Sequence, residues 1–212
     1  LVRSTDRVGG LTAGAAQELG LLEGTPVFGG CGDGMASAVG SGATDEGAGH
    51  IYLGTSGWVG VITQRNLTGK EGVVILQSAD PKNALLFAEM ETAGARLKWI
   101  ADEFYKAEKA DPNIPNVYAL MDEKVQSIPP GSDYLINTPW MYGERCPVGD
   151  TWVRSTFFNL STDHTREHLL RAVYEGVAYI LRWILEIVEK GFKFPLPILR
   201  MMGGGAQGAP WM

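Results

Sequence analysis

A glycine-rich bend carries the carboxylate that is best placed for chemistry in this sequence. The segment Gly29-Gly30-Cys31-Gly32-Asp33-Gly34 follows the apolar run at residues 26–28. Four glycines around one Asp permit positive φ angles and let a ligand approach the backbone without interference from a Cβ atom. Asp33 is therefore a candidate catalytic base. An ordinary N-cap in a tight turn is the structural alternative, because a helix-forming stretch begins at Met35.

A second glycine segment lies in a predicted β-hairpin. Two β-rich arms at residues 50–63 surround the turn Gly54-Thr55-Ser56-Gly57, and this pattern is typical of a hairpin. Two hydroxyls and unobstructed backbone N–H groups make such a turn suited to phosphate oxygens. A plain hairpin turn is an equally good interpretation, since Gly and Ser are common turn residues whatever the function.

A third glycine cluster follows the apolar run at residues 198–202 and reads Gly203-Gly204-Gly205-Ala206-Gln207-Gly208. A strand, a glycine loop and a helix start form the arrangement that brings a nucleotide against backbone amides. A flexible chain end is the alternative for this segment taken alone.

These three segments, in this order, resemble the FGGY family of carbohydrate kinases. That family has a Gly-Gly-x-x-Asp segment with the base, a Gly-Thr-Ser hairpin for phosphate and a Gly-Gly-Gly-Ala segment for adenosine. Residues 155–176 are similar to its second signature, with Asn159 where Gly is usual; Asn tolerates a left-handed backbone better than other non-glycine residues. Residues 139–147 are similar to the Gly-Glu-Arg-x-Pro stretch that precedes that signature.

The resemblance covers nearly the whole chain but only part of a family member. It implies an α/β chain with the actin-like ATPase (ribonuclease H-like) fold, mainly the C-terminal nucleotide-binding domain. Residues 1–48 are expected to end the N-terminal, sugar-side domain and to carry the Asp33 segment, and residues 49–212 to form a truncated ATP-binding domain. With no initiator Met, the chain is interpreted as a fragment that lacks most of the sugar-binding domain and the C-terminal end.

In function, the resemblance implies transfer of phosphate from ATP, with Mg²⁺, to a sugar hydroxyl, with a pentulose such as xylulose favoured. Asp33 would accept the hydroxyl proton and could meet the metal through Mg-ATP, and Gly32 and Gly34 would form a substrate-side loop. The implied nucleotide-binding residues lie in the hairpin turn and the third cluster: Gly54, Thr55, Ser56, Gly57, Gly204, Gly205 and Ala206.

Two alternatives to an active kinase stay open at this point. The chain could be a non-catalytic nucleotide-binding module of the same fold, against which the retention of Asp33 argues, or an inert fragment of a kinase. The resemblance also leaves a homodimer open.

The composition of the chain argues against some classes of binding partner. The chain has 212 residues, 45% of them hydrophobic, which is ample for a buried core. Its net charge of -6 argues against nucleic acid as a partner, and charges at Arg182, Glu186 and Glu189 interrupt the longest apolar stretch, so no membrane partner is expected. Cys31 and Cys146 lie far apart and outside any CxxC motif, which favours free thiols in the cytoplasm.

Hydrophobic periodicity predicts alternating helices and strands. The longest predicted helix spans residues 165–190, with Asp163 as its N-cap and Gly191 as its C′ residue. The other predicted helices are at residues 12–19, ended by Gly20, and at 94–109 and 116–126, and the predicted strands are at 25–28, 50–63, 84–88, 134–137 and 198–202.

The remaining polar residues are expected to have structural roles. The histidines at 50, 164 and 168 are expected to lie at the surface or to cap helices, and Glu144 is expected to pair with Arg145. Glu89 and Glu91 stand at strand spacing on a solvated face. The segment Thr92-Ala93-Gly94 opens a helix and allows an anion site there.

Overall fold

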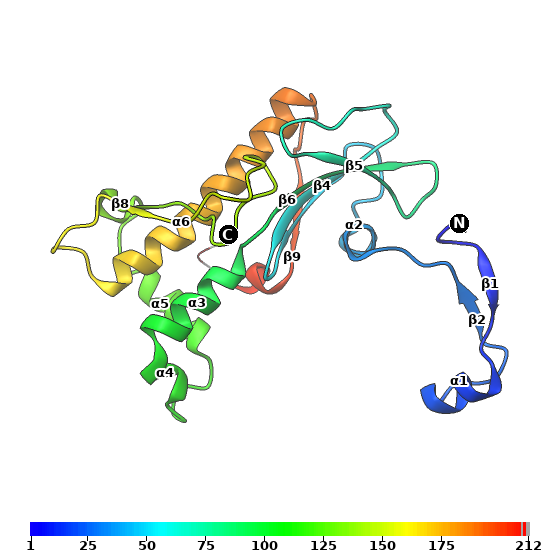
Figure 1. The fold of residues 1–212 in the computed structure, drawn as a ribbon, viewed down its shortest axis with the longest axis horizontal. Coiled ribbons are helices and arrows are strands. Elements are labelled where there is room, and N and C mark those ends of the chain that lie inside the picture. The colour runs from blue at the N-terminus through cyan, green and yellow to red at the C-terminus, as the bar shows by residue number, and fades with distance from the viewer. Residues whose placement is uncertain (209, 211–212) are drawn as a thin grey trace.

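A five-stranded sheet forms the centre of the molecule in the computed structural model, which describes residues 1–208 and 210 (Figure 1). The strand order is β5-β6-β4-β3-β9. All neighbouring strands are antiparallel except β3 and β9, which run parallel. The strands are β3 (Gly49–Leu53), β4 (Gly57–Thr63), β5 (Val74–Gln77), β6 (Ala84–Met90) and β9 (Leu199–Met202). The predicted hairpin and the predicted strands at 84–88 and 198–202 are therefore confirmed, and β5 was missed.

Alternation along the strands gives the sheet two buried faces. On one face, Val59, Val61 and Leu86 pack in the main core cluster together with Ile180 and Ile184 of helix α6 (Arg166–Glu186). The opposite face packs against helix α2 (Asp33–Ser41), whose Ala38 contacts Ile62 and Leu85. Successive residues of β4 therefore face α6 and α2 in turn.

The first 30 residues form a small unit that projects from the sheet (Figure 1). Strands β1 (Arg7–Gly10) and β2 (Pro26–Phe28) pair antiparallel around helix α1 (Ala13–Leu19). Thr12 caps the start of α1, and Gly20 ends it in the left-handed conformation with φ 65°. The prediction for Gly20 is confirmed.

A second group of helices lies beside the first half of α6 (Figure 1). The group consists of α3 (Gly94–Phe104), α4 (Lys106–Ala110) and α5 (Val117–Val125). The single helix predicted at 94–109 is broken at Tyr105, a fully buried residue with φ -125°. The strand predicted at 134–137 is shorter, because a 3-10 turn η1 (Ser132–Tyr134) precedes β7 (Ile136–Asn137), which pairs with β8 (Phe157–Phe158).

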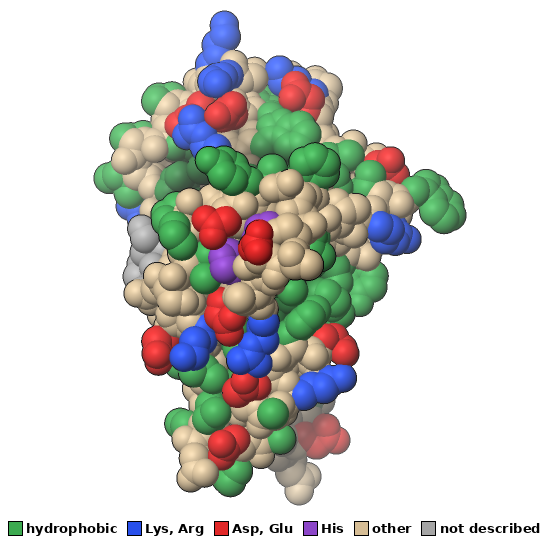
Figure 2. Space-filling model, turned by 90° about the vertical axis from the view of Figure 1, so that its left-hand side faces the viewer, with side chains coloured by type: hydrophobic (Ala, Val, Ile, Leu, Met, Phe, Trp, Pro, Cys, Tyr) green, Lys and Arg blue, Asp and Glu red, His purple; other side chains and the backbone are tan. Residues whose placement is uncertain are grey.

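The ends of α6 differ from both predictions. Thr165, not Asp163, is the N-cap, because its backbone N–H donates to Nδ1 of His168 at 3.0 Å. The far end continues into a π-helical turn η2 (Ile187–Gly191), so Gly191 completes that turn instead of following the helix as a left-handed C′ residue. Figure 2 shows histidine side chains beside acidic ones on the face at the start of α6, where Nε2 of His168 lies 3.0 Å from Oδ2 of Asp133.

Candidate functional site

The hairpin turn between β3 and β4 is fixed by the start of helix α3. The backbone N–H of Gly94 donates to the carbonyl of Gly54 at 2.7 Å, and the N–H groups of Ala93 and Ala95 donate to the carbonyl of Thr55 at 2.9 and 3.1 Å. These bonds occupy the amides of Ala93 and Gly94, two of the three residues at which an anion site was predicted. The first turn of α3 therefore holds the hairpin turn in place.

The third glycine cluster meets the same hairpin at Leu53. A Cβ added to Gly203 would lie 2.5 Å from the carbonyl oxygen of Leu53, and one added to Gly205 would lie 2.7 Å from its Cδ2. Gly203 also has φ 89°, a region that L side chains rarely adopt. The cluster is thus packed onto β3, which excludes the flexible-end interpretation, and it continues as a 3-10 turn η3 (Gly204–Gln207).

A cavity of about 540 Å³ opens where these segments meet. The hairpin turn, η3, α3 and α5 line it, together with one residue of α6. The predicted nucleotide residues on its wall are Gly54, Thr55, Gly204 and Gly205. Its further polar and aromatic lining comes from Lys98, Asn116, Tyr118, Asp122, Tyr174 and Gln207, which sequence reasoning missed because they belong to helices far apart in the chain.

The lining offers groups that a ligand can use. Within the described residues, no hydrogen bond joins the hydroxyls of Thr55 and Ser56 to another protein group. A Cβ on Gly204 would meet nothing within 4 Å, so the backbone there faces open space. Gly57 is buried in β4 against Met90, and Ser56 and Ala206 are outside the set of lining residues. The wall therefore combines the free hydroxyl of Thr55 with the open backbone at Gly204.

Asp33 lies apart from this cavity, at the start of α2 on the other face of the sheet. The N-cap is Gly32, so Asp33 is the first helical residue and the N-cap alternative is wrong. Its carboxylate is exposed, and Oδ1 accepts the backbone N–H of Gly34 at 2.8 Å. A negative charge in the first turn interacts favourably with the helix dipole. Gly34 is buried, and an added Cβ would lie 3.0 Å from the ring of Phe87.

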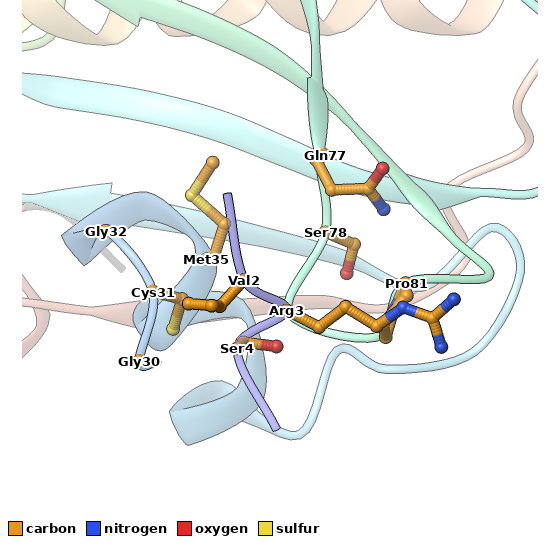
Figure 3. A pocket seen from close by; sticks show the side chains of 10 residues that line it. All are labelled: Val2, Arg3, Ser4, Gly30, Cys31, Gly32, Met35, Gln77, Ser78 and Pro81. Atoms are coloured by element: carbon orange, nitrogen blue, oxygen red, sulfur yellow. The ribbon is translucent and has the colours of Figure 1, made fainter. Parts of the chain in front are cut away.

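A second cavity, of about 470 Å³, lies beside the glycine bend that precedes Asp33 (Figure 3). Residues 30–32 and Met35 form one side, and residues 77–78 with Pro81 form the other. The chain start at residues 2–4 passes between them. Of the two glycines predicted to face a substrate, Gly32 lines this cavity and Gly34 packs against the sheet.

A buried polar network connects α2 with the hairpin. His50 on β3 is fully buried, so the surface role predicted for it is wrong, whereas His168 does cap α6. Nε1–H of Trp58 donates to Nε2 of His50 at 3.1 Å, and Oγ of Ser37 lies 3.4 Å from the same nitrogen. Burial lowers the pKa of His50 to about 4, so its ring is neutral and Nε2 acts as the acceptor.

The corner between β6 and α3 also differs from the prediction. Arg145 does not pair with Glu144 but with Glu89 at 2.6 Å and with Glu91. Glu89 and Glu91 therefore share Arg145 as an ion-pair partner. Glu144 is 3% exposed, and burial raises the pKa of its carboxyl group.

The described part of the chain holds no cluster of three or more His, Cys, Asp or Glu side chains that could coordinate a metal ion. Asp33 nevertheless fits the way Mg²⁺ is bound with nucleotides, through one or two carboxylates plus phosphate oxygens. Within the same residues no helix combines the length and apolar character needed to cross a bilayer.

Comparisons with known proteins identify the family of this chain. Residues 49–212 match the family model described as "FGGY family of carbohydrate kinases, C-terminal domain". A xylulose kinase of Lactococcus lactis subsp. lactis (strain IL1403) is 32% identical over 207 residues, which cover 98% of this chain and 40% of that protein. A gluconokinase of Bacillus subtilis (strain 168) is 30% identical over 198 residues, or 92% of this chain and 39% of that protein.

The solved structures give the same result. The crystal structure of xylulose kinase from Rhodospirillum rubrum has a TM-score of 0.79 and 28% identity, and the match covers 99% of this chain and 41% of that one. This chain therefore spans about 40% of the length of the curated relatives that it matches.

Proposed function

Because this chain belongs to the FGGY family of carbohydrate kinases, we propose that the protein containing it transfers the γ-phosphoryl group of ATP to a hydroxyl of a sugar. The chain has the mixed α/β, actin-like ATPase fold of this family, mainly its C-terminal domain. The boundary that we propose between a sugar-side part and a nucleotide-binding part is at residues 48 and 49.

One observation carries the proposal: the two glycine segments at the hairpin turn and at η3 share the wall of one cavity. Phosphoryl transfer needs positioning and charge stabilisation more than covalent help from the protein. The Thr55 and Ser56 hydroxyls suit phosphate oxygens, and the open backbone at Gly204 leaves room for the adenosine. A cavity of about 540 Å³ lies within the usual range for small-molecule sites.

In the proposed reaction, Asp33 accepts the proton of the attacking sugar hydroxyl. Its exposed Oδ2 is available for this, since Oδ1 accepts the N–H of Gly34. Mg²⁺, when bound with ATP, supplies charge neutralisation at the phosphates. Asp33 and the cavity lie on different faces of the sheet, so the reaction requires the phosphates to extend past the hairpin turn and the domains to close over both substrates.

For the acceptor we propose a pentulose such as xylulose, because xylulose kinases are among the relatives. A gluconokinase is 30% identical, against 32% for the xylulose kinase, which makes gluconate the first competing acceptor to test. We place the reaction in the cytoplasm, since the free thiols of Cys31 and Cys146 suit a reducing compartment. A non-catalytic nucleotide-binding module is the alternative function.

The test is a coupled ADP-release assay on the intact protein with xylulose, gluconate, glycerol and further pentuloses and hexuloses. We expect turnover with one sugar class and a kcat/KM for it at least about 100-fold above that for the others. ATP binding without turnover on any of them would favour the module, and absence of both would overturn the kinase assignment.

A further inference from the structure

The corner between β6 and α3, residues 91–93, is hydrogen-bonded to the loop that follows β7, residues 138–150. Oε1 of Glu144 accepts the backbone N–H of Glu91 at 2.8 Å. Oγ1 of Thr92 donates to the carbonyl of Pro139, also at 2.8 Å. Glu144 and Thr92 are 3% and 2% exposed, so solvent cannot replace these bonds. The corner is therefore bonded to this loop on one side and to the hairpin turn on the other.

Glu144 is itself held firmly in the loop. The same Oε1 accepts the backbone N–H of Arg145 at 2.9 Å, and the backbone of Glu144 exchanges two hydrogen bonds with Asp150, at 2.7 and 2.9 Å. Within the described residues Oε2 has no hydrogen-bond partner although it is buried. Burial of a carboxylate is unfavourable, and the two backbone N–H groups bound by Oε1 offset part of this cost.

The bonds form one continuous path from the loop to the turn. Glu144 fixes the amide of Glu91, and two residues later the amides of residues 93–95 fix the carbonyls of Gly54 and Thr55. Arg96, 1% exposed in the next position of α3, bonds Oδ1 of Asn137 in β7. A shift of this corner would therefore move the turn that brings Thr55 to the cavity wall.

We propose that Glu144 is a positioning residue for the phosphate turn at residues 54–57, acting through Glu91 and the first turn of α3. This inference rests on the proposed function, because it takes that turn to bind the phosphates of ATP. It gives the Gly-Glu-Arg segment a role in which the carboxylate is a hydrogen-bond acceptor and neither a base nor half of an ion pair.

The test compares Glu144→Ala with Glu144→Gln in the intact protein. The Ala variant leaves two N–H groups without their acceptor, and we expect it to raise the KM for ATP by roughly tenfold or more. The KM for the sugar should stay within about twofold, since the perturbed turn faces the nucleotide. The Gln variant keeps an oxygen at the same place and should restore the ATP KM to within about threefold.

Two further variants make the comparison decisive. Thr92→Val removes the hydrogen bond to the carbonyl of Pro139 with little change in side-chain volume. It should also raise the KM for ATP, and it replaces the Ala variant in the test if that variant does not fold. Arg145→Ala is the matched control, because it breaks the exposed pairs with Glu89 and Glu91 but keeps the backbone bonds of Glu144. We expect it to change the ATP KM by less than about twofold.

Amide hydrogen exchange followed by mass spectrometry separates this inference from the kinase assignment. In Glu144→Ala, peptides covering residues 50–60 and 91–96 should exchange faster, and peptides of α1 should not change. That result stands even if the protein proves not to use ATP. Unchanged exchange at residues 50–60 in the folded Ala and Val variants would overturn the role of Glu144 whatever the kinase activity, as would Gln failing to restore the Ala defect.

Discussion

Gly203 lies so close to Leu53 that a Cβ on the glycine would come within 2.5 Å of the leucine's carbonyl oxygen. This contact joins the end of β9 to the last residue of β3, two neighbouring parallel strands. It brings the hairpin turn and η3, about 150 residues apart in the chain, to the wall of one cavity. The glycines of η3 are therefore required for different reasons, and substitutions can separate them.

Gly204 provides the cleanest test of the nucleotide role. A side chain there would enter open space at the cavity wall without a protein clash. We expect Gly204→Val to raise the KM for ATP by roughly tenfold or more, to leave the sugar KM within about twofold, and to shift Tm little. Steady-state kinetics and thermal melting of one variant measure all three, and an unchanged ATP KM would remove η3 from the nucleotide site.

Gly205 is the matched comparison, because a Cβ at this position would lie 2.7 Å from the Leu53 side chain. Gly205→Val should destabilise the protein by about 1–3 kcal/mol through overpacking. Its melting temperature should fall, unlike that of Gly204→Val. A stable Gly205→Val protein would show that η3 is not packed on β3 as described.

The buried His50 predicts a specific pH dependence of stability. Burial lowers its pKa from 6.5 to about 4, so the unfolded state binds the proton more readily than the folded state. The stabilisation is fully present above pH 6.5 and is lost as the pH falls through about 4. The shift corresponds to about 3 kcal/mol.

Chemical denaturation of the wild-type protein and of His50→Gln at pH 7 and pH 4.5 measures this contribution. The difference in unfolding free energy between the two proteins should shrink at the lower pH. A constant difference would mean that His50 does not titrate as the buried geometry requires.

The chain by itself should be inactive. It spans about 40% of the length of its curated relatives, and most sugar contacts of an FGGY kinase are expected outside it. We expect residues 1–212 to show no sugar-dependent ADP release and at most weak ATP binding by calorimetry. Turnover by this chain alone would contradict the two-domain account.

Local sequence patterns predicted the parts of the site that depend on local geometry. The hairpin, the strand before the third glycine cluster and the left-handed residue Asn159, with φ 67°, follow from turn chemistry and side-chain alternation. The N-cap of α6 was misplaced by two residues because Asp163 and Thr165 are both good caps. His168, three residues after Thr165, decides the choice by accepting the N-cap amide.

Contacts between distant segments could not be derived in this way. The path of the loop after β7, which brings Arg145 to Glu89, depends on tertiary packing that no local pattern encodes. The burial of His50 did leave a signal, since it stands opposite Gly60 in the hairpin register. A Cβ on Gly60 would clash with the imidazole ring, so a glycine facing a histidine across a hairpin can indicate a buried ring.

Asp33 is the catalytic base of the proposed reaction, and the kcat of Asp33→Asn in the intact protein measures that role. Asn cannot take the proton, so kcat should fall by roughly 10²–10⁴-fold, with ATP affinity within about threefold of wild type. Tm should change little, because Asp33 is an exposed residue in the first turn of α2. A kcat near the wild-type value with both substrates saturating would contradict the account.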